Sequence, residues 1–174
     1  MEQAGKVTVC CVTPCVYAHE ELDCSCRKTV TIDSILTEKD LVTQEDLTYV
    51  RLPVSDHHAP SVEIIDEFIQ TIISHKNSWF HIHCLGGKGR TTTFLTLLDM
   101  IHNAKEIDFE MIVKRQSALG HDAKNFLNPM SEHSWEVPLA QKRLELLKNF
   151  YRYCKENNDN FSTLFSVWLR KNGV

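Results

Sequence analysis

The segment from Cys84 to Arg90 limits the possible folds of this chain more than any other, because three of its seven residues are glycine. A segment so rich in glycine does not form regular structure. It follows a β-prone run, Trp79–His83, and precedes an amphipathic helical pattern over Thr91–Ile101. In a loop that joins a strand to a helix, successive N–H groups can turn toward one centre, where the helix N-terminus adds about half a positive charge. The segment therefore predicts a cradle for a tetrahedral anion.

The side chains in and around this loop suit phosphate chemistry. Arg90 presents a planar fork that can bind two phosphate oxygens. Cys84 lies beside convergent amides and a guanidinium, where thiols have pKa values of about 3.5–7.5. Its thiolate is a nucleophile directed at phosphorus. We expect Thr91 to donate to the sulfur, His83 to order the loop, and the remaining loop residues to bind substrate: Leu85, Gly86, Gly87, Lys88 and Gly89.

Displacement at phosphorus also needs a proton for the departing oxygen, and Asp56 is the first candidate for this general acid. It lies in a turn-rich loop just after a β-prone run, Tyr49–Val54. Such a loop can close over a bound ester, and the same carboxylate can then activate the water that hydrolyses a phosphocysteine. Asp122 is the second candidate.

The rest of the chain predicts a single α/β domain over residues 1–174 with a mostly helical C-terminal half. A helix capped by Ser61 buries a face whose apolar residues recur at helical spacing. Pro138 can open a long helix, and Phe161–Lys171 forms a final one. Near the start, Lys6–Tyr17 is β-prone, Val30–Leu36 can be a short strand, and 37–46 is weakly helical. The face of the Ser61 helix is Ile65, Phe68, Ile69 and Ile72.

Composition and charge exclude several classes of partner. The net charge of −4 provides no basic field for nucleic acid. No apolar run reaches the roughly 20 residues of a membrane span, and no signal peptide is evident, so we expect a cytoplasmic protein. The seven cysteines are expected to be free thiols or core residues, since the cluster Cys10–Cys26 fits no zinc-knuckle spacing. We expect no metal and no cofactor.

The combination of His83, Cys84, five intervening residues, Arg90 and Thr91 resembles the signature of the cysteine-dependent protein tyrosine phosphatase superfamily. Together with 49–57, 79–93 and 114–120, it is most similar to the tyrosine-phosphatase-like inositol polyphosphatases, or cysteine phytases. The resemblance implies a central sheet flanked by helices and metal-free hydrolysis through phosphocysteine. It also implies that Asp56 is the acid and that His57 contacts substrate.

Two departures from this family accompany the resemblance. The family often has an acidic residue and then an alanine after the cysteine, where this chain has Leu85 and Gly86. Residues 1–35 match poorly, so we expect a shortened N-terminal part or a fragment of a longer protein.

Basic residues bear on the substrate. Lys88 at the rim of the loop, with Lys114 and Arg115 if their helix abuts it, would suit an inositol polyphosphate such as phytate. Alternatively, Lys114 and Arg115 form a solvated helix face. Other functional hypotheses are a protein tyrosine phosphatase acting on phosphoproteins, a catalytically silent phosphate-binding module and a thiol redox protein.

Overall fold

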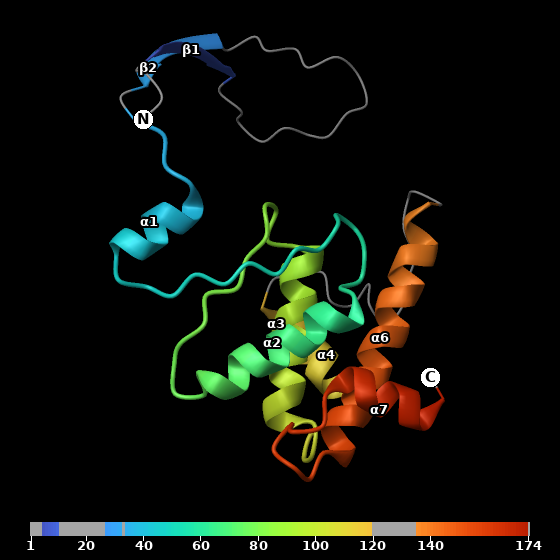
Figure 1. The fold of residues 1–174 in the computed structure, drawn as a ribbon. Coiled ribbons are helices and arrows are strands. Elements are labelled where there is room, and N and C mark those ends of the chain that lie inside the picture. Colours follow the sequence, from blue (N-terminus) through green and yellow to red (C-terminus); the bar gives the residue numbers. More distant parts are fainter. Residues whose placement is uncertain (1–4, 11–26, 33, 120–134, 174) are drawn as a thin grey trace. The chain divides into compact units, whose positions relative to one another are not determined.

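The computed structural model describes residues 5–10, 27–32, 34–119 and 135–173 (Figure 1). The chain divides into two compact units, Met1–Arg51 and Leu52–Val174. Each unit is described by itself below. The predicted site residues all belong to the second unit, and Asp122 lies outside the described residues.

The first unit contains a two-stranded antiparallel sheet and a short helix. Strand β1 (Gly5–Cys10) pairs with β2 (Arg27–Ile32), with Gly5 opposite Ile32 and Cys10 opposite Arg27. Helix α1 (Glu38–Gln44) begins with a capping box, because Thr37 accepts from the Asp40 amide and the Asp40 carboxylate accepts from the Thr37 amide. The helical prediction for 37–46 is confirmed by α1.

The second unit is built from helices (Figure 1). Helix α2 (Val62–Ser74) is capped by Ser61, whose side chain accepts from the Ile64 amide, and its predicted apolar face is buried. Helices α3 (Gly89–Asn103), α4 (Phe109–Ala118), α6 (Glu136–Glu156) and α7 (Phe165–Asn172) follow. Helix α3 packs against α4 and α6, and α7 packs against α2 and α6. None of the helices in the described part of the chain combines the length and apolarity needed to cross a bilayer.

One core joins these helices. Its fully buried members include Leu97 and Met100 of α3, Ile112 of α4, and Phe150 of α6. A polar contact also ties α3 to α4, because the buried Asp99 carboxylate accepts from Arg115 and Gln116. Helix α3, whose first residues belong to the glycine-rich loop, is therefore anchored in this core.

The prediction of a central sheet is wrong. Neither Tyr49–Val54 nor Trp79–His83 forms a strand, and within 52–119 and 135–173 the structure contains helices, turns and loops only. The alternation in Trp79–His83 is still visible, since Phe80 and Ile82 pack on the core while Trp79 and His81 are exposed. An alternation of apolar and polar residues indicates which side chains face the core, but a strand also requires backbone hydrogen bonds to a neighbouring strand. The described part of this unit provides no such partner for either run.

Candidate active site

The Cys84 sulfur lies at the focus of a ring of hydrogen-bond donors. The Thr91 hydroxyl and the backbone N–H groups of Thr91, Gly87 and Gly86 all bond to it. The Thr91 oxygen in turn accepts from the Cys84 amide at 2.8 Å. One hydroxyl therefore links the two ends of the loop and contacts the sulfur that they enclose.

These donors change the acidity of the thiol. Partial burial raises the pKa of Cys84, but the hydrogen bonds from Thr91, Gly87 and Gly86 outweigh it and lower the pKa to about 7. Cys154 in α6 has no such ring, and its burial raises its pKa well above the ordinary value. Of these two cysteines, only Cys84 is a substantial fraction thiolate near neutral pH.

The backbone of the loop explains how the amides converge. Gly87 has a φ of +65°, which lies in the left-handed region that side chains with a Cβ disfavour. Gly86 has open space where a Cβ would lie, and its φ is not in that region. The positive φ at Gly87 turns two neighbouring N–H groups toward one side, as in the anion-binding concavities that proteins form from backbone alone.

Arg90 lies in the first turn of α3 and holds the loop against the segment that carries Asp56. Its Nη1 donates to the Val54 carbonyl oxygen at 3.3 Å, and its Nη2 lies 2.9 Å from Asp56 Oδ1. Its Nε is buried and has no hydrogen-bond partner among the described residues. Because a buried unsatisfied donor costs about 1–3 kcal/mol, this N–H is prepared for an acceptor such as a phosphate oxygen.

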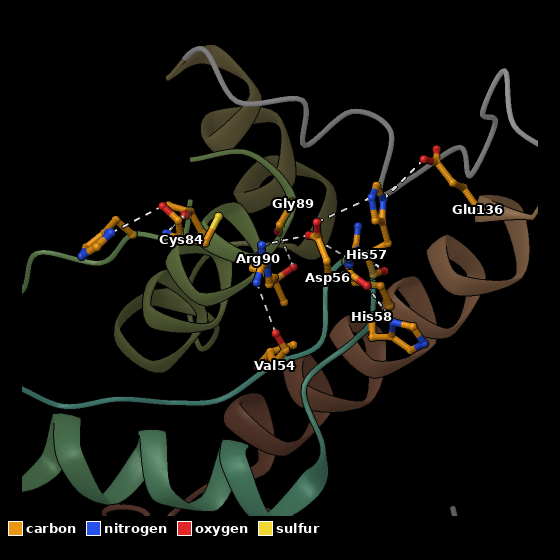
Figure 2. Close-up of polar contacts among 12 residues, drawn as sticks. Val54, Asp56, His57, His58, Cys84, Gly89, Arg90 and Glu136 are labelled. Atoms are coloured by element: carbon orange, nitrogen blue, oxygen red, sulfur yellow. Dashed lines mark hydrogen bonds and ion pairs between the residues drawn. The ribbon is translucent and has the colours of Figure 1, made fainter. Parts of the chain in front are cut away.

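The loop of Asp56 closes toward Arg90, and its own contacts fix its shape (Figure 2). The Asp56 carboxylate accepts from the His57 amide at 3.1 Å, and the Asp56 carbonyl contacts His58 Nδ1 at 2.7 Å. The His57 ring lies between two carboxylates, with Nε2 3.8 Å from Asp56 and Nδ1 3.4 Å from Glu136. The predicted contact of His57 with substrate stays a prediction.

The remaining predicted residues lie at various distances from this centre. Leu85 and Lys88 are exposed on the loop, and His83 Nδ1 lies 3.4 Å from the Cys84 carbonyl. Lys114 is on the exposed side of α4, while Arg115 is paired with Asp99 of α3. Among the described residues, no group of three His, Cys, Asp or Glu side chains is placed to hold a metal. Most of the Cys10–Cys26 cluster lies outside the described residues.

The sequence interpretation missed two residues of α6 that reach the site. Arg143 donates from Nη2 to the His57 carbonyl oxygen and packs against Gly89 of the loop. Glu136 contacts the ring of His57. A Glu and an Arg seven residues apart lie on the same face of a helix, but this spacing alone does not reveal that the face meets the Asp56 loop.

Replacing Thr91 with valine should raise the pKa of Cys84 toward the ordinary thiol value, because the hydroxyl bond to the sulfur is lost. The test measures how fast iodoacetamide alkylates Cys84 at each pH, by mass spectrometry of the peptide that contains it. In the wild type this rate should rise with pH and reach half its maximum near pH 7. This midpoint should be higher in Thr91→Val. The control is Thr96→Val, which removes a buried hydroxyl that donates to the Thr92 carbonyl instead. Equal midpoints in all three proteins would contradict the role of Thr91.

Comparisons with known proteins agree with the geometry. The family model for PTP-like phytases matches residues 7–102, and the description of that family reads "inositol hexakisphosphate". The effector protein hopD2 of Pseudomonas syringae pv. tomato is 32% identical over 79% of this chain and 30% of its own length. The protein AvrBs1.1 of Xanthomonas campestris pv. campestris is 33% identical over 53% of this chain and 88% of its own.

Two solved structures are also similar. A PTP-like phytase from Bdellovibrio bacteriovorus has a TM-score of 0.74 and 37% identity, over 81% of this chain and 54% of the phytase. The PTP-like myo-inositol phosphatase from Mitsuokella multacida, solved with myo-inositol-(1,3,4,5)-tetrakisphosphate, has a TM-score of 0.78 and 31% identity. That match covers 85% of this chain and 25% of the phosphatase, so this chain spans a minor part of it. Because the family match covers more than half of its residues and includes the loop from Cys84 to Arg90, this chain belongs to the PTP-like phytase family.

Proposed function

We propose that this chain hydrolyses phosphomonoesters through a phosphocysteine intermediate and that its substrates are inositol polyphosphates such as phytate. The observation that carries the proposal is the donor ring around the Cys84 sulfur, together with the pKa of about 7 that it produces. A sulfur anion surrounded by amides that can bind phosphate oxygens has the arrangement that attack on phosphorus requires.

In the first step the Cys84 thiolate attacks phosphorus, and a sulfur–phosphorus bond forms as the ester phosphorus–oxygen bond breaks. Asp56 gives its proton to the departing oxygen. The loop amides and Arg90, including its unpartnered Nε, hold the three remaining oxygens of the phosphoryl group. Their fixed donors stabilise the charge that develops in the transition state.

In the second step water attacks the same phosphorus, Asp56 takes a proton from the water, and the sulfur–phosphorus bond breaks. Inorganic phosphate and the Cys84 thiolate result. The Thr91 hydroxyl stabilises the departing sulfur, since it already bonds to it in the free protein. The two steps together use one water, and the enzyme returns to its starting protonation state.

Substrate binding must rearrange one contact. In the free protein Asp56 is paired with Arg90 at 2.9 Å, so an incoming phosphate dianion competes with this carboxylate for the guanidinium. Asp56 is largely exposed, and its pair with Arg90 therefore exchanges readily with solvent and ligand. The carboxyl remains beside the phosphate after the exchange, where it can deliver a proton.

The substrate class rests on the family and on charge. The Mitsuokella relative was solved with an inositol tetrakisphosphate. In this chain Lys88 is exposed at the start of α3, where it can contact a second phosphate on the same ring. An isolated phosphotyrosine has no second phosphate for such a lysine.

A phosphate-release panel tests the proposal. The chain is incubated with phytate, with a phosphoinositide and with a phosphotyrosine peptide, and free phosphate is measured for each. We expect the fastest release from phytate. A strong preference for the peptide would contradict the substrate class, and phosphate binding without release from any ester would contradict the enzymatic proposal as a whole.

A further inference from the structure

We infer that Arg143 of α6 is a positioning residue, which aims the Asp56 carboxyl at the leaving group by holding the backbone of His57 against the phosphate-binding loop. This inference rests on the proposed function and goes beyond it, because it gives a role in the reaction to a helix that comes after both loops in the sequence. Arg143 acts through His57 and does not touch the reacting atoms in this arrangement.

The path from Arg143 to Asp56 consists of two hydrogen bonds. Arg143 Nη2 donates to the carbonyl oxygen of His57, and the amide of His57 donates to Asp56 Oδ1 at 3.1 Å. His57 therefore links the two groups, because its carbonyl oxygen accepts from the Arg143 guanidinium and its amide donates to the Asp56 carboxylate. A shift in the His57 backbone would move the proton donor.

The other side of the Arg143 guanidinium faces the phosphate-binding loop. A Cβ at Gly89 would lie 3.6 Å from Arg143 Nη1, which is ordinary van der Waals contact. Arg143 thus lies next to Gly89 of the loop that holds the phosphoryl group, and it is bonded to the loop that supplies the proton. Few side chains can set the distance between two loops in this way, and the planar guanidinium does so with little loss of freedom.

The conformation of His57 shows that the acid loop is held from outside. Its φ of +61° lies in the left-handed region, which costs a residue with a Cβ roughly 1–2 kcal/mol. Such a conformation persists only where surrounding contacts impose it. The start of α6 supplies these contacts, since Glu136 Oε1 lies 3.4 Å from His57 Nδ1 and the Trp135 ring packs edge-on at 5.0 Å.

The charges around Arg143 favour this role over that of a substrate ligand. Burial lowers the pKa of Arg143, while the nearby carboxylates of Glu136 and Asp56 act in the opposite direction. The guanidinium is therefore already compensated by two carboxylates and a carbonyl oxygen. A guanidinium that already donates to the backbone of the Asp56 loop is suited to hold that loop in place.

The test compares two aryl phosphates that differ only in the leaving group. The phenoxide of 2,4-dinitrophenyl phosphate leaves without protonation, whereas that of phenyl phosphate needs the acid. The measured quantity is kcat/KM, which reports the steps up to formation of the phosphocysteine and leaves out its later hydrolysis. We expect Arg143→Met to lower kcat/KM for phenyl phosphate by about tenfold, which is part of the factor of about 10²–10⁴ that general acid catalysis contributes as a whole. Its kcat/KM for 2,4-dinitrophenyl phosphate should change by less than about twofold.

Matched variants separate positioning from folding and from loss of charge. Lys142→Met removes a neighbouring, exposed cation of the same helix and should leave both rates unchanged. Arg143→Lys keeps a donor for the His57 carbonyl and should restore part of the phenyl phosphate rate. Glu136→Gln weakens a different contact to the same residue, His57, and should shift the ratio of the two rates in the same direction as Arg143→Met.

Three outcomes would contradict the positioning role of Arg143. Equal losses of kcat/KM on both substrates in Arg143→Met and Glu136→Gln, with an active wild type, would overturn the positioning role and leave the proposed function intact. A rise in KM for phytate with an unchanged ratio of the aryl rates would identify Arg143 as a substrate ligand and overturn it too. A wild-type chain inert on both aryl phosphates would contradict the proposed function and the role of Arg143 together.

Discussion

Cys84→Ser should abolish phosphate release and leave phosphate binding in place. Removal of a covalent nucleophile from another hydrolase lowers kcat by about 10⁶-fold, and a serine hydroxyl is far less acidic than a thiol of pKa about 7. The substitution retains the positions of Thr91 and Arg90, so the cradle still receives an anion. Release is measured as inorganic phosphate from phytate, and binding by calorimetry with inorganic phosphate.

The control for this variant is Cys154→Ala. Cys154 is buried in α6, and burial raises the pKa of its thiol, so it has no part in the proposed chemistry. Its loss should leave kcat close to that of the wild type. Residual activity near wild type in Cys84→Ser would remove Cys84 from the mechanism.

The pH profile adds a second check on the nucleophile. Below pH 7 the Cys84 thiol is mostly protonated, and above it the thiolate predominates. With 2,4-dinitrophenyl phosphate, whose leaving group needs no acid, kcat/KM should therefore rise as pH increases through about 7. Thr91→Val should move this rising limb to higher pH, in step with its alkylation profile.

Asp56→Asn should slow esters with poor leaving groups far more than activated ones. An amide cannot deliver a proton, so phenyl phosphate should lose about 10²–10⁴-fold in kcat/KM, which reports the steps up to formation of the phosphocysteine. By contrast, 2,4-dinitrophenyl phosphate should lose much less in the first step. The structure adds an expectation about binding: the variant removes the carboxylate that lies 2.9 Å from Arg90 Nη2, so inorganic phosphate should bind more tightly.

A matched variant for Asp56 is Asp66→Asn. Asp66 accepts from the Ser166 amide, where α7 begins beside α2. It should leave the ratio of the two aryl rates unchanged. If Asp56→Asn slows both aryl phosphates equally, another group is the acid, and Asp122 is the next residue to test.

The helices were predictable because their signals are local. The cap at Ser61 and the apolar spacing of Ile65, Phe68, Ile69 and Ile72 lie within one segment, and α2 follows them closely. The central sheet was predicted wrongly because a strand depends on a neighbour that the alternation of Phe80 and Ile82 does not encode. The long helix expected from Pro138 begins two residues earlier, at Glu136.

Parts of the candidate site were predictable for the same reason. Cys84, Gly87 and Thr91 lie within eight residues, and the ring of donors around the sulfur forms within that span. The pairing of Arg90 with Asp56 joins two separate segments, and the closing of the Asp56 loop over a bound ester stays a prediction. No residue pattern indicated that Arg143 reaches the same place.

The amino-acid sequence by itself determined the glycine-rich turn and the cysteine at its start, because a short turn of this kind that leads into a helix has few backbone arrangements and converging amides are one of them. Only the tertiary structure decided which distant side chains contact the Asp56 loop. Arg143 and Glu136 meet His57 because α6 packs along α3 and brings its first turns beside both loops. That packing depends on the whole apolar core of the second unit, and a local pattern cannot report it.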